Sequence, residues 1–179
     1  VDEVYLDTES DEVFSLATGR NHFELRRLAE LASNKTNGNQ LLLHEASRVP
    51  DADIYVQALP TAPFLSRKTI EKAIYELVRS RTNDSLFGVS KQRLYLWNSD
   101  DKPINYDPSN IPNSFDLKDT TIETMSLYLI RKEALLRTQS RIGVNPILFN
   151  IPLLESIDIN TEEDFDFAKI IHNGLRGEK

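Results

Sequence analysis

Residues 53–78 read DIYVQALPTAPFLSRKTIEKAIYELV, and this stretch decides the fold class. Its first seven residues form a β-rich run that ends at two prolines, so a strand is predicted here. Ser66 is placed to cap a helix in which apolar residues recur at spacings of three and four. The apolar positions are Ile70, Ala73, Ile74, Leu77 and Val78. The stretch therefore predicts a strand followed by an amphipathic helix.

The rest of the chain repeats this alternation of strands and helices. Short strands are predicted at residues 4–6, 86–89, 94–97, 126–130, 146–151 and 156–159, and helical patterns at 11–17, 23–32, 41–46, 131–137 and 165–171. Thr8 with Asp11 and Thr161 with Asp164 each form a predicted capping box. Strands alternating with helices predict one α/β domain over residues 1–179, with three α/β/α layers around a mostly parallel sheet.

The composition narrows the class of protein further. The chain has 21 Lys and Arg residues against 28 Asp and Glu residues, a net charge of −7, so nucleic acid is not an expected partner. It has no Cys, which excludes disulfides, thiolate zinc sites and a cysteine nucleophile. No apolar run approaches the roughly 20 residues that cross a bilayer, and no signal peptide is visible. We therefore expect a cytoplasmic protein without a membrane partner.

Residues 158–160 are the segment whose side chains most favour a metal-binding site, through Asp158 and Asn160. In an extended strand, residues i and i+2 point to the same side, so their side-chain oxygen atoms are predicted to lie together. Mg²⁺ prefers such oxygen ligands, typically one or two carboxylates with substrate phosphates and water. The alternative is that these polar residues only end a strand and cap the next helix. A calcium-binding loop is excluded, because Glu163 stands where that loop needs Gly.

Two other polar segments have a binding and a structural interpretation. Thr61 lies between two prolines at a strand end, where backbone groups could face a base, or the prolines could simply end the strand. Arg26 and Arg27 match the geometry of phosphate oxygens, or they lie on a solvated helix face. The three histidines share no metal-ligand spacing, and the six glycines form no phosphate-binding loop. These residues alone therefore do not name a reaction.

Six segments follow one another along the chain in a specific order. They are VDEVYLDTESDE at 1–12, RLAELA at 27–32, VQALPTAPF at 56–64, DSLFGV at 84–89, IET at 122–124 with Tyr128, and ESIDINTEEDF at 155–165. Together they resemble the acylneuraminate cytidylyltransferase family, the CMP-sialic acid synthetases and their relatives, and the last segment is the most specific match. The resemblance covers essentially the whole chain. It implies a Rossmann-like fold of the nucleotide-diphospho-sugar-transferase type.

The resemblance also implies a reaction and its residues. Enzymes of this family couple CTP to a 2-keto sugar acid, giving a CMP-sugar and pyrophosphate, with Mg²⁺. Asp158 matches the catalytic metal-binding aspartate, with Asn160 as its partner. The residues matched to nucleotide binding are Arg27, Thr8, Glu9 and Thr61, and those matched to sugar binding are Gln57, Glu123 and Thr124. Family members dimerise through an excursion, so residues 98–120, which carry three prolines, are expected to form the arm of a homodimer.

The chain departs from the family pattern at several positions. The first strand and the Arg-Gly-Gly-Ser-Lys type loop, which hold the CTP phosphates in the family, have no match, so the domain is expected to be incomplete at its N-terminus. Glu9, Leu59 and Asn160 stand where the family has Asp, Gln and Asp. Two alternatives follow. One is a truncated or degenerate relative that acts as a non-catalytic binding or assembly module. The other is a nucleotidyltransferase for another sugar.

Overall fold

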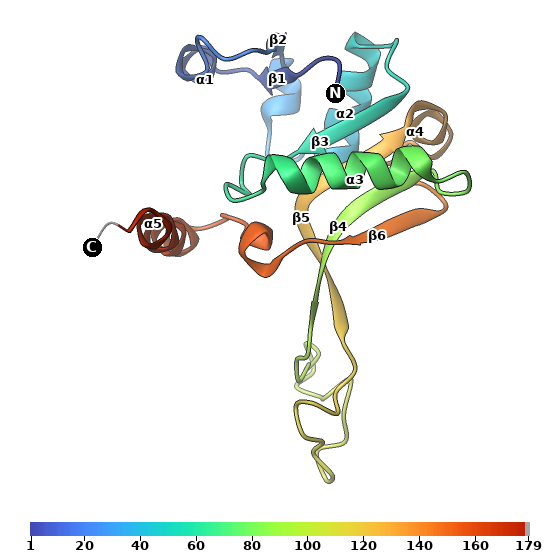
Figure 1. The fold of residues 1–179 in the computed structure, drawn as a ribbon, viewed down its shortest axis with the longest axis vertical. Helices are drawn as coiled ribbons and strands as arrows, with labels where there is room; N and C mark the ends of the chain where they lie inside the picture. Colours follow the sequence, from blue (N-terminus) through green and yellow to red (C-terminus); the bar gives the residue numbers. More distant parts are fainter. Residues whose placement is uncertain (178–179) are drawn as a thin grey trace.

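The computed structural model describes residues 1–177. Its larger sheet has the strand order β3-β5-β4-β6, formed by β3 (Ile54–Ala58), β4 (Ser85–Gln92), β5 (Thr120–Arg131) and β6 (Pro146–Asn150). β5 is antiparallel to both of its neighbours, whereas β4 and β6 are parallel. β3, β4 and β6 therefore share one direction, and β5 alone is reversed (Figure 1). The prediction of an α/β fold with a parallel-rich sheet is confirmed.

Helices cover both faces of this sheet, which gives the three predicted layers (Figure 1). α3 (Arg67–Arg79) packs on one face, and α2 (Gly38–Arg48) and α4 (Lys132–Thr138) pack on the other. The buried members of the two clusters are Ala73, Leu77, Leu86, Leu127, Leu129 and Ile151 on the α3 face, and Leu42, Ala46, Tyr55, Ile130, Ala134 and Leu135 on the opposite face. On β5, Leu127 and Leu129 belong to the first cluster and Ile130 to the second, because side chains of a strand point to opposite faces in turn.

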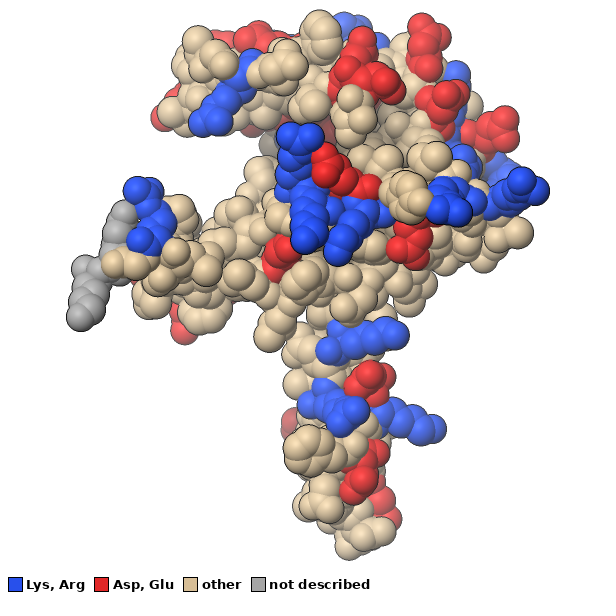
Figure 2. Space-filling model, in the orientation of Figure 1, with Lys and Arg blue, Asp and Glu red and all other residues tan. Residues whose placement is uncertain are grey.

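The α3 helix follows the predicted pattern with one exception. The Ser66 hydroxyl accepts a hydrogen bond from the Thr69 N–H, as a capping residue should. Ala73 and Leu77 are fully buried, whereas Val78 is 56% exposed. Val78 lines a shallow surface groove together with Val1, so its predicted core position is wrong. On the outer surface, basic side chains over α3 are interspersed with acidic ones (Figure 2).

A separate two-stranded sheet contains the N-terminal elements. β1 (Tyr5–Thr8) pairs in parallel with β2 (Phe23–Arg26), and α1 (Asp11–Leu16) connects the two strands. The helical pattern predicted for residues 23–32 is wrong in its first half, because pairing with β1 overrides a weak local preference. Its second half forms the 3-10 helix η1 (Ala29–Ala32).

The two predicted capping boxes have different outcomes. Thr161 accepts a hydrogen bond from the Asp164 N–H, and the Asp164 carboxylate accepts one from the Thr161 N–H, so this box is confirmed. The box predicted for Thr8 and Asp11 is wrong, because Ser10 caps α1 instead. The Thr8 hydroxyl accepts a hydrogen bond from the Ser10 N–H, so Thr8 lies two residues before the capping residue.

An arm connects β4 to β5 and explains why β5 is reversed. Residues 93–119 project from the sheet, so β4 and β5 are the two sides of one long hairpin (Figure 1). The strand predicted at 94–97 is reduced to a single bridge between Trp97 and Pro103. Tyr106 packs edge-on against the rings of Tyr95 and Trp97, which gives the arm a small aromatic cluster.

The C-terminal part of the chain leaves the sheet after β6. η2 (Leu153–Ser156) is a 3-10 helix, and irregular backbone then leads to α5 (Glu162–Arg176), which lies apart from the sheet (Figure 1). The strand predicted at 156–159 is therefore wrong. Instead of pairing with a strand, this segment forms a backbone hydrogen bond with the turn after β3: the Ile159 N–H donates to the Thr61 carbonyl at 2.9 Å. Within residues 1–177, no helix is long and apolar enough to cross a membrane.

Candidate functional site

Polar side chains from separate elements meet on the α2 side of the larger sheet. Gln57 of β3 lies between two of them: its Nε2 is 3.4 Å from Oε2 of Glu45, and its Oε1 is 3.5 Å from Nη1 of Arg141. Arg141 contacts Tyr128 of β5, whose hydroxyl donates to Glu123 of the same strand. We call Gln57, Glu123, Tyr128 and Arg141 the Arg141 cluster. It brings together two predicted sugar-binding residues, Gln57 and Glu123.

Tyr128 holds the Arg141 guanidinium in place by stacking and by a hydrogen bond. The centre of the guanidinium lies 3.6 Å from the centroid of the Tyr128 ring, and Nη2 donates to the Tyr128 hydroxyl at 3.0 Å. Burial raises the pKa of Tyr128, the hydrogen bond to Glu123 raises it further, and the positive charge of Arg141 opposes both effects. Tyr128 is therefore a neutral phenol at physiological pH. It donates to Glu123 while its oxygen accepts from Arg141.

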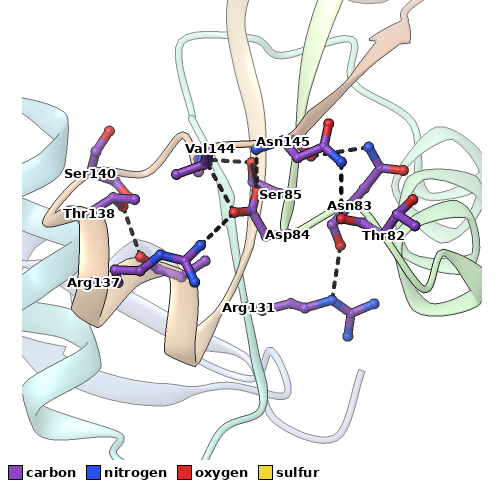
Figure 3. A network of polar contacts seen from close by, with 12 residues as sticks. Thr82, Asn83, Asp84, Ser85, Arg131, Arg137, Thr138, Ser140, Val144 and Asn145 are labelled. Atoms are coloured by element: carbon purple, nitrogen blue, oxygen red, sulfur yellow. Dashed lines mark hydrogen bonds and ion pairs between the residues drawn. The ribbon is translucent and has the colours of Figure 1, made fainter.

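Asp84 anchors the loop between α4 and β6 through Val144 and Asn145 (Figure 3). The same loop carries Arg141. Oδ1 of Asp84 accepts from the Asn145 N–H at 3.0 Å, and its Oδ2 accepts from the Val144 N–H at 3.0 Å and from Arg137 at 2.9 Å. Burial alone would raise the pKa of Asp84, but the hydrogen bonds from Asn145 and Val144 lower it below its usual value. Asp84 therefore remains a carboxylate at neutral pH and holds the loop next to the start of β4.

A second polar group lies at the end of β1. Arg27 donates from Nε to Oδ2 of Asp7 and from Nη2 to the Asp7 carbonyl, both at 3.0 Å. Its Nη1 lies 3.7 Å from the Glu9 carboxylate. The Asp7 side chain is only 10% exposed, and its Oδ1 is buried without a hydrogen-bond partner in the described part of the chain. The predicted nucleotide-binding residues Arg27 and Glu9 therefore lie together, with Thr8 between Asp7 and Glu9 in sequence.

Glu45 of α2 links this second group to the Arg141 cluster. Burial raises the pKa of Glu45 to about 7, and the nearby Asp7 carboxylate raises it as well, whereas Gln57 and Arg27 act in the opposite direction. Two buried carboxylates facing each other favour sharing a proton over carrying two negative charges. The contact from β1 to α2 therefore depends on a proton near neutral pH.

Asp158 and Asn160 lie together, as their spacing predicts, although their backbone is not a strand. The Asn160 Nδ2 donates to Oδ2 of Asp158 at 2.8 Å, and Oδ1 of Asp158 is buried without a partner in residues 1–177. Thr61 is brought to the same place by its hydrogen bond from the Ile159 N–H. The Asp158 charge also contributes to the raised pKa of Tyr128, after burial and the Glu123 hydrogen bond, so this segment lies near the Arg141 cluster.

These residues fit a Mg²⁺ ion only in combination with other ligands. Within residues 1–177, no set of three or more acidic or histidine side chains is placed to hold a metal ion. One carboxylate oxygen of Asp158 is unpartnered, and Mg²⁺ in nucleotide sites usually takes one or two carboxylates with phosphates and water. The donor set therefore suits a nucleotide-bound Mg²⁺, rather than an ion enclosed by the protein.

Two positions differ from what the sequence suggested. Thr124 is 6% exposed, and its hydroxyl lies 2.7 Å from that of Ser126, so the structure does not bring it to the open part of the cluster. Arg141 was not among the predicted site residues. No local spacing identifies it, because its partner Gln57 lies 84 residues away in sequence. A long-range contact of this kind has no signature in a single sequence.

Comparison with known proteins identifies similar structures but no family. No family model matches the chain, and no curated protein sequence matches it either. Many solved structures match the chain, and two of them illustrate matches over almost its whole length. The 4-diphosphocytidyl-2C-methyl-D-erythritol synthase of Anaerococcus prevotii has a TM-score of 0.67 and 15% identity, over 97% of this chain and 82% of that one. A CMP:2-keto-3-deoxy-manno-octonic acid synthetase complexed with CTP has a TM-score of 0.65 and 15% identity, over 98% of this chain and 82% of that one. At this identity the likeness shows the fold alone: the chain has the fold that these two synthetases share.

Proposed function

We propose that this chain is the core of a cytidylyltransferase that couples CTP to a 2-keto sugar acid, giving a CMP-sugar and pyrophosphate. The observation that carries the proposal is the unpartnered Oδ1 of Asp158, buried near the Arg141 cluster. A buried carboxylate oxygen without a partner is costly, so a ligand that supplies a cation there is favoured. The fold shared with a synthetase that was solved with CTP supports the same proposal.

In the proposed reaction, a hydroxyl of the sugar acid attacks the α-phosphorus of CTP. The new O–P bond forms as the bond to pyrophosphate breaks, and the hydroxyl proton leaves to solvent. Gln57 and Glu123 hold the acceptor by hydrogen bonds to its hydroxyl groups, while Asp158 lies on the phosphate side. The hydrogen bond from Ile159 to Thr61 fixes the Asp158 segment to the end of β3. Catalysis then rests on positioning and on charge neutralisation.

Mg²⁺, when bound, supplies the charge that neutralises the phosphates. Oδ1 of Asp158 would hold it, and Asn160 would add an amide oxygen once its side chain rotates away from Oδ2 of Asp158. Asp158 is thus the residue on which the phosphate side of the site depends.

We assign the rest of the nucleotide site to the ends of β1 and β3. Among the described residues, β1 pairs only with β2 and β3 pairs only with β5, so each has an edge without a strand partner. The proposal includes a further strand and a phosphate-binding loop between these edges. Arg27, Thr8 and Glu9 would then lie beside the phosphates, and Thr61 beside the base and sugar.

Calorimetric titration of CTP, with and without Mg²⁺, tests this proposal. We expect binding that requires Mg²⁺ and is weaker for UTP and GTP. The near-isosteric Asp158→Asn variant should lose the Mg²⁺ dependence, because it removes the charge that holds the ion. Asp166→Asn is the matched control, since Asp166 is exposed on α5 and forms an exposed salt bridge with Lys169. CTP affinity that is the same with and without Mg²⁺, or absent, would refute the proposal.

The arm favours a homodimer, which we include in the proposal. Its most exposed apolar side chains are Trp97, Ile104, Ile111 and Phe115, at 54%, 62%, 65% and 84% exposure. Apolar residues gathered on a projecting segment are typical of an interface. Light scattering should give the mass of two chains, and Phe115→Asp should lower it to that of one. The non-catalytic alternative predicts the same dimer without CTP affinity, so the two measurements together separate enzyme from assembly module.

A further inference from the structure

A small cavity opens beside Arg141. Its volume is about 240 Å³, and it is lined by Glu123, by residues 37–39 at the start of α2 and by residues 140–142. Arg141 is the one cation and Glu123 the one anion among these lining residues. The cavity therefore offers one positive and one negative group to any molecule that enters it.

Arg141 forms no direct ion pair in the described part of the chain. Among residues 1–177, the ion pairs within 4.0 Å do not include Arg141. Its guanidinium instead contacts neutral groups: the Tyr128 ring and hydroxyl, and Gln57 at 3.5 Å. An arginine held in place by neutral partners keeps its charge and its planar fork available for an incoming oxyanion.

We propose that Arg141 binds the carboxylate of the acceptor substrate, while Glu123 accepts a hydrogen bond from a hydroxyl of the same molecule. This inference rests on the proposed function, and it assigns the carboxylate of that acceptor to one residue of the cavity. A phosphate group carries a charge of about −1.5 to −2 at neutral pH and would face Glu123 without a second cation in the cavity. The balance of one Arg and one Glu thus favours a carboxylate over a phosphate.

Gly38 provides a way to move Arg141 without removing it. A Cβ atom at Gly38 would lie 2.3 Å from Nη1 of Arg141, so alanine there forces the end of this flexible side chain to shift. Gly38 is in the first turn of α2 and does not have a positive φ. Alanine therefore fits the helix backbone and raises its helix propensity. Gly38→Ala therefore tests whether binding depends on where the guanidinium lies, whereas Arg141→Gln tests whether binding depends on the guanidinium at all.

The test measures binding of 2-keto-3-deoxy-manno-octonic acid and N-acetylneuraminic acid, and of their methyl esters, without CTP. We expect the wild-type protein to bind at least one acid more tightly than its ester. Arg141→Gln should weaken acid binding at least about tenfold and abolish the preference for acid over ester. Gly38→Ala should weaken acid binding in the same direction. Arg79→Gln is the matched control, because Arg79 stacks over Tyr75 in the same way but on the outer face of α3.

The outcomes distinguish a failure of this inference from a failure of the proposed function. If Arg141→Gln keeps the preference for acid over ester, the inference is overturned and CTP binding still stands. If the wild-type protein binds CTP but neither acid, Arg141 is not an acceptor site. If inorganic phosphate displaces the acid at equal concentration, the cavity is a phosphate site and the carboxylate assignment is wrong. A wild-type protein that binds neither acid nor CTP overturns both proposals.

Discussion

In the larger sheet, Leu86, Leu127 and Leu129 are fully buried, whereas in the β1–β2 sheet Tyr5 and Phe23 are 37% and 55% exposed. The larger sheet is covered by helices on both faces and is stabilised by apolar packing. The smaller sheet adds polar contacts from Asp7 to Arg27 and Glu45. The comparison shows that the β1–β2 sheet, which is proposed to bind the nucleotide phosphates, is also the part of the molecule held by charged groups. Such contacts respond to pH and ligands, whereas apolar packing responds little to either.

Leu129→Ala should have the largest effect, because it removes a fully buried side chain from the core of the larger sheet. The side chain is fully buried between β5 and α3. Its truncation should lower the free energy of unfolding by about 3 kcal/mol. Denaturant unfolding followed by circular dichroism measures this change. A loss below about 1 kcal/mol would contradict the assignment of this cluster as the main core.

Arg27→Met should destabilise the smaller sheet alone. The change keeps the aliphatic stem but leaves the Asp7 carboxylate, which is 10% exposed, without its cation. We expect about 2 kcal/mol of local destabilisation, seen by hydrogen exchange as lost protection in β1 and β2 with unchanged protection in β4 and β5. Arg26→Met is the matched control: its pair with Asp11 is exposed, and its loss should change stability by less than about 0.5 kcal/mol.

Glu45→Gln should remove a pH dependence that belongs to the contact between the sheets. The folded-state pKa of Glu45 is raised to about 7 from 4.5, so between these values the folded protein binds a proton that the unfolded chain releases. Stability from this group is therefore present below about pH 4.5 and is lost as the pH rises through about 7. The difference in unfolding free energy between Glu45→Gln and wild type should grow by about 1–2 kcal/mol from pH 5 to pH 8.

Parallel denaturant titrations at the two pH values measure this difference. Glu71→Gln, which removes an exposed carboxylate on α3, controls for the loss of one negative charge elsewhere. A constant difference between Glu45→Gln and wild type would show that the buried carboxyl pair does not hold the two parts together.

Phe23→Ala should have the smallest effect. Phe23 packs on Tyr5 with ring centroids 5.4 Å apart, but the two residues remain 55% and 37% exposed. We expect a loss below about 1 kcal/mol in the same hydrogen-exchange experiment, confined to β1 and β2. A larger loss would mean that apolar contacts hold the smaller sheet as well, and the contrast between the sheets would disappear.

The sequence predicts the larger sheet and its helices better than the smaller sheet. The strand at 53–59 and the helix from Ser66 have strong periodic patterns, and both form nearly where expected. β2 carries the pattern of a helix and becomes a strand only because β1 pairs with it. Pairing between separate segments is a tertiary effect, so propensity within one segment does not detect it.

In the candidate site, too, local contacts were predicted from the sequence and long-range contacts were not. Asp158 and Asn160 are two residues apart, and their side chains meet as this spacing predicts. Arg141 and Glu45 reach their partners across 84 and 12 residues, and neither was predicted. The Arg141 loop depends on Asp84, which precedes β4 and lies 60 and 61 residues from the two N–H groups it accepts from. Contacts at this separation appear only when the chain is folded.

Product analysis is the most direct test of the proposed transfer. The purified protein is incubated with CTP, Mg²⁺ and each of the two sugar acids, and the mixture is examined by mass spectrometry and a pyrophosphate assay. We predict a CMP-sugar and pyrophosphate in equal amounts, with both products lost in Asp158→Asn and retained in Asp166→Asn. Magnesium-dependent CTP binding without any CMP-sugar would contradict the assignment of the acceptor. Absence of both CTP binding and product would contradict the proposal that this fold carries a cytidylyltransferase site.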